Sequence, residues 1–145
     1  MKGARIVERP IDVRQLIAAV EEHRFGAISV FLGTVRDTND GRDVSGIEYS
    51  AYVAMAETEM LSILDEAEIR FGVQSIVVEH RIGSLEPGEL SVAIAAASAH
   101  RDPAMDCARF VIEEIKRRVP IWKLEHYKDG TREWIDPTRT DTAAV

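Results

Sequence analysis

Two lysines flank a proline in the segment Lys-Arg-Arg-Val-Pro-Ile-Trp-Lys, which runs from Lys116 to Lys123. Proline ends a helix because it lacks an amide proton and its ring clashes with the preceding turn. If the chain turns back after Pro120, a lysine at a helix end and a lysine in the next strand converge on one anionic ligand. Trp122 and Lys123 point to opposite faces of that strand, so one of them meets the core or a cleft. We therefore predict an anion site built on Lys116 and Lys123.

Three further cationic side chains lie at the ends of predicted elements. His100 and Arg101 follow a predicted strand and precede a helix start at Asp102-Pro103, where unpaired amides favour an anion. Arg36 closes another predicted strand, at the mouth of a polar loop. For each of these residues, and for the two lysines, a solvated surface charge is the alternative interpretation.

The other residue types narrow the chemistry. The four histidines lack metal-ligand spacing and one cysteine cannot complete a zinc cluster, so we expect no metal site and no cofactor. Cys107 falls inside a predicted helix, where a core position is favoured over a nucleophile. We find neither a glycine-rich phosphate loop nor a Gly-x-Ser-x-Gly elbow. His80-Arg81 is interpreted as an ordinary surface pair, because a turn follows it.

The composition bounds the class of protein. The 145 residues are 46% hydrophobic and 30% charged, which suits one globular domain. The net charge of -7 disfavours a protein that coats nucleic acid, since phosphate binding needs a basic face. With one cysteine, no apolar leader and no apolar run of about 18 residues, we expect a cytoplasmic protein without a membrane span. We expect a single domain over residues 1–135 and a loose C-terminal tail over 136–145.

Apolar periodicity and turn residues place the elements that must position these side chains. Helices are predicted over residues 13–23, 53–71 and 102–118, the last with Asp102 as its N-cap. Strands are predicted over residues 4–8, 27–35, 44–52, 74–81, 90–99, 121–127 and 132–135. Strand 27–35 is predicted to be central because it is apolar along its length. The polar segment 37–43 is predicted to be a mobile loop, and strand 90–99 is retained despite the helix propensity of its alanines.

A set of short motifs extends from residue 26 to residue 134. They are Gly26-Ala27, Phe31-x-Gly33-x-Val35-Arg36, Tyr49-x-Ala51-Tyr52 with Met55-Ala56, His80-Arg81-x-Gly83-x-Leu85, Gly88-Glu89, His100-Arg101, Lys116, Pro120-x-Trp122-Lys123-x-Glu125, Asp129-Gly130 and Trp134. Each motif alone is unspecific, but together their order and spacing resemble the large catalytic subunit of molybdopterin synthase. The chain departs from that pattern at Leu124, where many relatives have a basic residue, and at Ser50, where glutamate is common.

The resemblance implies an α+β fold with a hammerhead-type α/β subdomain, an additional antiparallel β-sheet and three main helices. It implies a catalytic domain that converts cyclic pyranopterin monophosphate (precursor Z) to molybdopterin. The sulfur would come from the C-terminal thiocarboxylate of a small ubiquitin-like subunit. The implied assembly is a homodimer of large subunits, each receiving the Gly-Gly tail of one small subunit, which makes a heterotetramer.

By position, the family's two essential lysines fall on Lys116 and Lys123. The implied pterin-phosphate site comprises Thr34, Val35, Arg36, His100, Arg101, Lys116, Lys123, Leu124 and Glu125. Two alternatives remain from the residues themselves. The same cations suit a non-catalytic anion-binding or scaffolding module, whereas a structural dimerisation module would tolerate substitution of both lysines.

Overall fold

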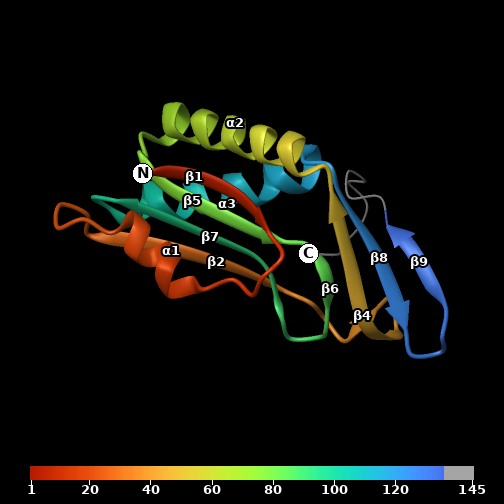
Figure 1. Ribbon diagram of the computed structural model, residues 1–145. Helices are drawn as coiled ribbons and strands as arrows, with labels where there is room; N and C mark the ends of the chain where they lie inside the picture. Colours follow the sequence, from red (N-terminus) through yellow and green to blue (C-terminus); the bar gives the residue numbers. More distant parts are fainter. Residues whose placement is uncertain (136–145) are drawn as a thin grey trace.

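In the computed structural model, which describes residues 1–135, two β-sheets and three helices form the fold (Figure 1). The first sheet has the strand order β1 (Lys2–Val7), β5 (Ser75–Arg81), β7 (Leu90–Ser98) and β2 (Ala27–Thr34). Its β1–β5 pair is parallel and its other pairs are antiparallel. The second sheet has the order β3 (Thr38–Asn39), β4 (Arg42–Ala51), β8 (Ile121–Tyr127) and β9 (Arg132–Ile135), and β6 (Gly83–Leu85) pairs with β4. The predicted tail, residues 136–145, lies outside the described residues.

The helices cover both faces of the first sheet. Helices α2 (Val53–Phe71) and α3 (Arg101–Arg118) pack on one face, and α1 (Val13–Val20) packs on the other (Figure 1). Side chains of β7 alternate between these two layers: Ile94 and Ala96 join the α2–α3 core, whereas Ala93 and Ala95 join the α1 core. Both faces of β7 are buried, so small apolar side chains suit this strand. The packing on both faces outweighs the helix propensity of the alanines, which explains why this segment is a strand. None of the helices described is long and apolar enough to cross a membrane.

The turn after α3 brings the two predicted lysines to the same end of the molecule. Helix α3 ends at Arg118, and the amide of Val119 still donates to the carbonyl of Ile115 at 3.0 Å. Pro120 then leads directly into β8, which pairs antiparallel with β4. The predicted reversal after the proline is confirmed.

The predicted α+β class is confirmed, but the predicted place of β2 is wrong. β2 is the edge strand of the described first sheet and pairs with β7 alone. Ile28, Val30 and Leu32 share the face of β2 that points to the α1 side, and all three are exposed. Helix α1 packs against β5 and β7 instead, so an apolar run that suits a central strand lies at an edge.

The segment predicted as a mobile loop is a tight hairpin. Strands β3 and β4 pair from Asn39 and Arg42, which leaves Asp40 and Gly41 as the two turn residues. Their φ angles are 51° and 75°, as in the type I′ turns whose twist matches that of paired strands. Residues 38–43 therefore extend the second sheet.

Helix α3 begins slightly before its predicted start. Its N-cap is His100 rather than Asp102, and Asp102 lies in the first turn. An acidic side chain there still complements the helix dipole, so the local chemistry agrees although the boundary differs.

Candidate active site

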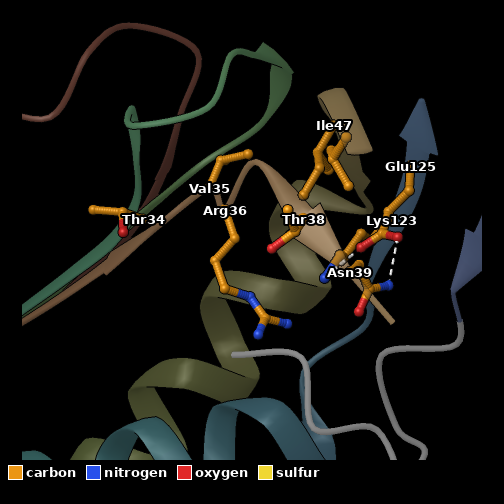
Figure 2. Close-up of a pocket in the computed structure, with 9 residues that line it drawn as sticks. Thr34, Val35, Arg36, Thr38, Asn39, Ile47, Lys123 and Glu125 are labelled. Atoms are coloured by element: carbon orange, nitrogen blue, oxygen red, sulfur yellow. Dashed lines mark hydrogen bonds and ion pairs between the residues drawn. The ribbon is translucent and has the colours of Figure 1, made fainter. Parts of the chain in front are cut away.

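A pocket lies where the end of β2 meets the second sheet (Figure 2). Thr34, Val35 and Arg36 approach it from β2 and the residues that follow. Lys123 and Glu125 approach it from β8. Its wall is completed by Thr38 and Asn39 of β3 and by Val44 and Ile47 of β4. The fold thus gathers five of the residues predicted for the site around one hollow.

Lys123 and Glu125 form an ion pair inside this pocket. They are two residues apart on β8, so their side chains share one face of the strand. Lys123 Nζ lies 3.2 Å from Glu125 Oε1, and the two side chains are 11% and 3% exposed. Trp122 points to the opposite face, where its ring packs against Tyr52 at 5.8 Å between centroids. The prediction that one member of the Trp122–Lys123 pair meets a cleft is confirmed, and that member is the lysine.

The carboxylate of Glu125 is buried and well supplied with donors. Its Oε2 accepts hydrogen bonds from the Tyr127 hydroxyl at 2.6 Å and from the Asn39 amide at 2.7 Å. Burial by itself would raise the pKa of Glu125, but these two bonds and the charge of Lys123 outweigh burial and lower it. Glu125 is therefore an anion that only accepts hydrogen bonds.

Lys116 lies half-buried in the last turn of α3. Burial, followed by the positive charges of Lys123 and Arg36, lowers the pKa of Lys116 to about 8. Because Lys123 and Arg36 shift this pKa, the three cations share one electrostatic field. Within residues 1–135 no carboxylate forms an ion pair with Lys116, whereas Lys123 has Glu125.

The interpretation of His80 as a surface residue is wrong. The side chain is buried on β5, with its ring edge to face against Tyr49 at 5.1 Å. Nδ1 lies 2.9 Å from the carbonyl oxygen of Arg81, which can only accept, so Nδ1 carries the proton. Burial lowers the pKa of His80 to about 4, and the charge of Lys116 acts in the same direction. The alternation of β5 could have indicated this burial, because His80 shares a face with Val78.

Four predicted site residues do not line this pocket within the described chain: Lys116, whose pKa responds to Arg36 and Lys123, and His100, Arg101 and Leu124. His100 and Arg101 are exposed at the start of α3, and the helix rises about 22 Å over the fifteen residue steps from Arg101 to Lys116. Leu124 points to the face of β8 opposite Lys123, where its strand neighbour is Trp134. One copy of the chain therefore assembles only part of the predicted set.

Sequence reasoning missed Asn39 and Tyr127, the two hydrogen-bond donors to Glu125. The alternation Lys123-x-Glu125-x-Tyr127 along β8 could have indicated Tyr127, since the three side chains share one face. Asn39 gives no such local indication, because it meets Glu125 through the pairing of β3, β4 and β8.

Thiol and metal chemistry have little support in the part of the chain that the structure describes. Cys107 is buried in α3, and burial raises the pKa of its thiol to about 12, so the thiol stays protonated. Among residues 1–135, no group of three or more His, Cys, Asp or Glu side chains is placed to hold a metal ion.

Comparisons with known proteins agree with the resemblance seen in the sequence. The family model described as MoaE protein matches residues 6–118. The molybdopterin synthase catalytic subunit of Oryza sativa subsp. indica is 42% identical over 136 residues, covering 90% of this chain and 70% of the relative. The crystal structure of molybdopterin synthase from Staphylococcus aureus superposes with a TM-score of 0.87 at 36% identity, covering 91% of this chain and 96% of the other.

A further solved structure concerns a complex. The protein–protein complex of subunits 1 and 2 of the molybdopterin-converting factor from Helicobacter pylori 26695 contains a chain that matches with a TM-score of 0.73 at 26% identity. The match covers 92% of this chain and 90% of that chain.

Proposed function

Because the chain belongs to the MoaE family, whose relatives include molybdopterin synthase catalytic subunits, we propose that it converts cyclic pyranopterin monophosphate to molybdopterin. Each of the two sulfur atoms comes from the C-terminal thiocarboxylate of a small ubiquitin-like subunit, so two successive transfers complete one dithiolene. The observation that carries this proposal is that Arg36 and Lys123 line one pocket and that their charges, together with burial, lower the pKa of Lys116 nearby. Both reactants are anions, and this pocket is cationic in a protein with a net charge of -7.

The cations offset a repulsion that would otherwise prevent the reaction. Bringing a cyclic phosphate and a thiocarboxylate together in a partly desolvated site costs several kcal/mol without counter-charges. Arg36, at the exposed rim of the pocket, binds the phosphate. Lys123, fixed beside Glu125, stabilises negative charge that develops during the transfer.

We assign the proton transfer to Lys116. The thiocarboxylate sulfur forms a carbon–sulfur bond with the pterin side chain, and the oxygen that leaves takes a proton from the Lys116 ammonium group. Water then hydrolyses the resulting thioester, which leaves the sulfur on the pterin and returns the small subunit as a carboxylate. A pKa of about 8 suits this role, because a general acid works best when its pKa lies near the operating pH.

The small subunit is the partner that this reaction requires. The Helicobacter pylori relative is described as a complex of two different subunits, which supports a two-subunit assembly for this chain. We propose that the Gly-Gly tail of the small subunit enters the pocket with its thiocarboxylate towards Lys116 and Lys123.

A second copy of the chain would supply the missing cations. His100 and Arg101 adjoin the start of β2, where the amide of Gly26 donates to the carbonyl of Ala99 at 3.2 Å, whereas Arg36 follows the end of β2. Antiparallel pairing of β2 with β2 of a second copy would place each start beside the other's end. The dimer would thus bring His100 and Arg101 of one copy to the pocket of the other.

Two properties of β2 support this pairing. It is the edge strand of the described sheet, so its outer backbone groups are available to another strand. Its exposed Ile28, Val30 and Leu32 form an apolar row that a second copy would cover.

We also propose that residues 1–135 form one catalytic domain, since they contain every residue assigned to the site. Cys107, the single cysteine of the chain, is a buried free thiol. This suits a reducing compartment, and we propose the cytoplasm.

Release of the dithiolene product tests the function. The purified protein, mixed with precursor Z and the thiocarboxylated small subunit, should form molybdopterin, whereas a small subunit ending in a plain carboxylate should bind and give none. Lys116→Ala and Lys123→Ala should abolish product with the fold intact, and Lys128→Ala, which removes an exposed lysine in the β8–β9 turn, should not. Phosphate binding without product in the wild type would indicate a non-catalytic binding module instead.

Subunit complementation tests the dimer. A Lys116→Ala chain and an Arg101→Ala chain, each inactive or impaired alone, should regain activity when combined, because a mixed dimer has one pocket with both residues intact. If Arg101 served the pocket of its own chain, no pocket of the mixed dimer would be complete and mixing would restore nothing.

A further inference from the structure

Lys123 is connected to the β3–β4 hairpin through Glu125. One oxygen of that carboxylate, Oε1, lies 3.2 Å from Lys123 Nζ. The other, Oε2, accepts from Asn39 Nδ2 at 2.7 Å and from the Tyr127 hydroxyl at 2.6 Å (Figure 2 shows the bond from Asn39). Glu125 is only 2% exposed, so water has little access to replace these donors. The Glu125 carboxylate on β8 therefore connects Asn39 of β3 to Lys123. Because β3 and β8 both pair with β4, three strands of the second sheet determine this contact.

The two donors are themselves held in place. Asn39 directly precedes the Asp40–Gly41 turn, whose paired positive φ angles are those of a two-residue hairpin that matches the strand twist. On the other side of that turn, the Arg42 guanidinium lies over the Tyr127 ring at 3.5 Å from its centroid. The same hairpin therefore contacts Glu125 directly through Asn39 and braces Tyr127 through Arg42.

We propose that Asn39, Glu125 and Tyr127 are positioning residues that hold the Lys123 ammonium group at the pocket wall before substrate binds. The inference rests on the proposed function, in which Lys123 stabilises charge that develops during sulfur transfer. A lysine has a flexible four-carbon stem and a single point charge, so its position must be fixed by its partners. A cation already in place loses little further entropy when charge develops beside it, which makes its stabilisation of the transition state more effective.

This role differs from the substrate contact that the family resemblance assigns to Glu125. Both of its oxygens already have partners within the protein, and its negative charge would repel a phosphate or a thiocarboxylate. The two roles separate in kinetics: loss of a substrate contact raises KM, whereas loss of a positioning residue lowers kcat.

Two variants remove one donor each and leave Glu125 and Lys123 in place. Asn39→Asp keeps the shape of the side chain but replaces the donor by an acceptor, and Tyr127→Phe removes only a hydroxyl. We expect each to lower kcat about tenfold with KM within about twofold of wild type, as misplacement of a catalytic group does. Ser45→Ala is the matched control, because its hydroxyl donates to the His126 carbonyl at 3.1 Å on the same strand pair and is exposed. Unchanged kcat in both variants, or a raised KM with kcat retained, would overturn the proposal.

A substrate-free measurement separates this proposal from the proposed function. Protons of a buried, paired ammonium group exchange slowly with water, so Lys123 should give a sharp 1H–15N signal in the wild type and in Ser45→Ala. The signal should broaden or vanish in Asn39→Asp and in Tyr127→Phe, while thermal unfolding shows that both variants are folded. An unchanged signal in the two variants would refute the positioning role. Failure of the wild type to form dithiolene, with these signals behaving as expected, would count against the proposed function alone.

Discussion

Lys116 and Lys123 share one electrostatic field but lie in opposite environments. Lys123, on β8, has the carboxylate of Glu125 at 3.2 Å, and that carboxylate has two further donors. Lys116, at the end of α3, has cations as its electrostatic neighbours and no carboxylate partner among residues 1–135. The same residue type is thus prepared for two tasks: a fixed positive charge on the strand and a group that titrates near neutral pH on the helix.

The difference has a thermodynamic consequence. The pKa of Lys116 falls from 10.5 to about 8, which corresponds to about 3 kcal/mol of unfavourable free energy for the charged form in the folded protein. Because the folded pKa is the lower one, this cost is fully present below pH 8 and is relieved as the pH rises towards 10.5. The positive charge of Lys116 thus destabilises the folded protein, whereas the charge of Lys123 is compensated by the Glu125 carboxylate.

The largest expected effect is on catalysis. Lys116→Met and Lys123→Met each keep the aliphatic stem and remove the charge, so product formation should fall at least about a hundredfold in both. Lys128→Met, in the exposed β8–β9 turn, is the control. Near-normal product formation by either site variant, measured with purified protein, would remove that lysine from the mechanism.

The same two substitutions should have opposite effects on stability. Lys116→Met relieves a charge without a counter-ion and should raise the free energy of unfolding at pH 7 by about 1–3 kcal/mol. Lys123→Met leaves the Glu125 carboxylate without its cation and should lower it by about 1–3 kcal/mol. Urea unfolding measures both values. Changes of the same sign would contradict the opposite environments of the two lysines.

A smaller effect is expected at His80, whose pKa is lowered by burial and by the charge of Lys116. Its pKa is about 4 in the folded protein and 6.5 in the unfolded chain, so the unfolded state binds the proton first as the pH falls. Stability should therefore decrease below pH 6.5, by about 2 kcal/mol at pH 5. His80→Gln should remove this part of the acid dependence, as measured by urea unfolding at pH 5 and pH 7. An unaltered dependence in the variant would show that His80 is not its source.

The smallest expected effect is at Arg36. Arg36→Ala removes a phosphate ligand, so KM for the pterin should rise about tenfold with kcat largely retained. It also removes one of the two charges that lower the pKa of Lys116, so that pKa should rise. A loss of kcat with KM unchanged would instead place Arg36 in the chemical step.

Local patterns in the sequence were sufficient for much of the fold and part of the site. The bounds of α2, β8 and β9 agree with those predicted from apolar spacing and turn residues, and Pro120 indicated the reversal that joins the two lysines. Features that depend on pairing between distant segments were not predictable in this way. Asn39 reaches Glu125 from 86 residues away, and no local pattern records that contact.

The edge position of β2 was missed for a different physical reason. An apolar strand is predicted to be central because both of its faces avoid water, yet Ile28, Val30 and Leu32 are exposed in one copy of the chain. A sequence records that a face is apolar but does not record whether its cover belongs to the same chain. Arg101 and Lys116 lie far apart along α3 for the same reason. In the proposed dimer, Arg101 of one copy serves the pocket of the other copy.

The pH dependence of a single turnover tests the central claim most directly. Thiocarboxylate and cyclic phosphate remain anions between pH 6 and pH 10, so a titration in that range belongs to the protein. With Lys116 as the proton donor, the rate of dithiolene formation should be constant at lower pH and fall as the pH rises through about 8. Lys116→Arg, which stays charged at every pH in this range, should lack that fall in whatever activity remains. A wild-type rate that is flat from pH 7 to pH 9, or that rises, would contradict the assignment of the two lysines.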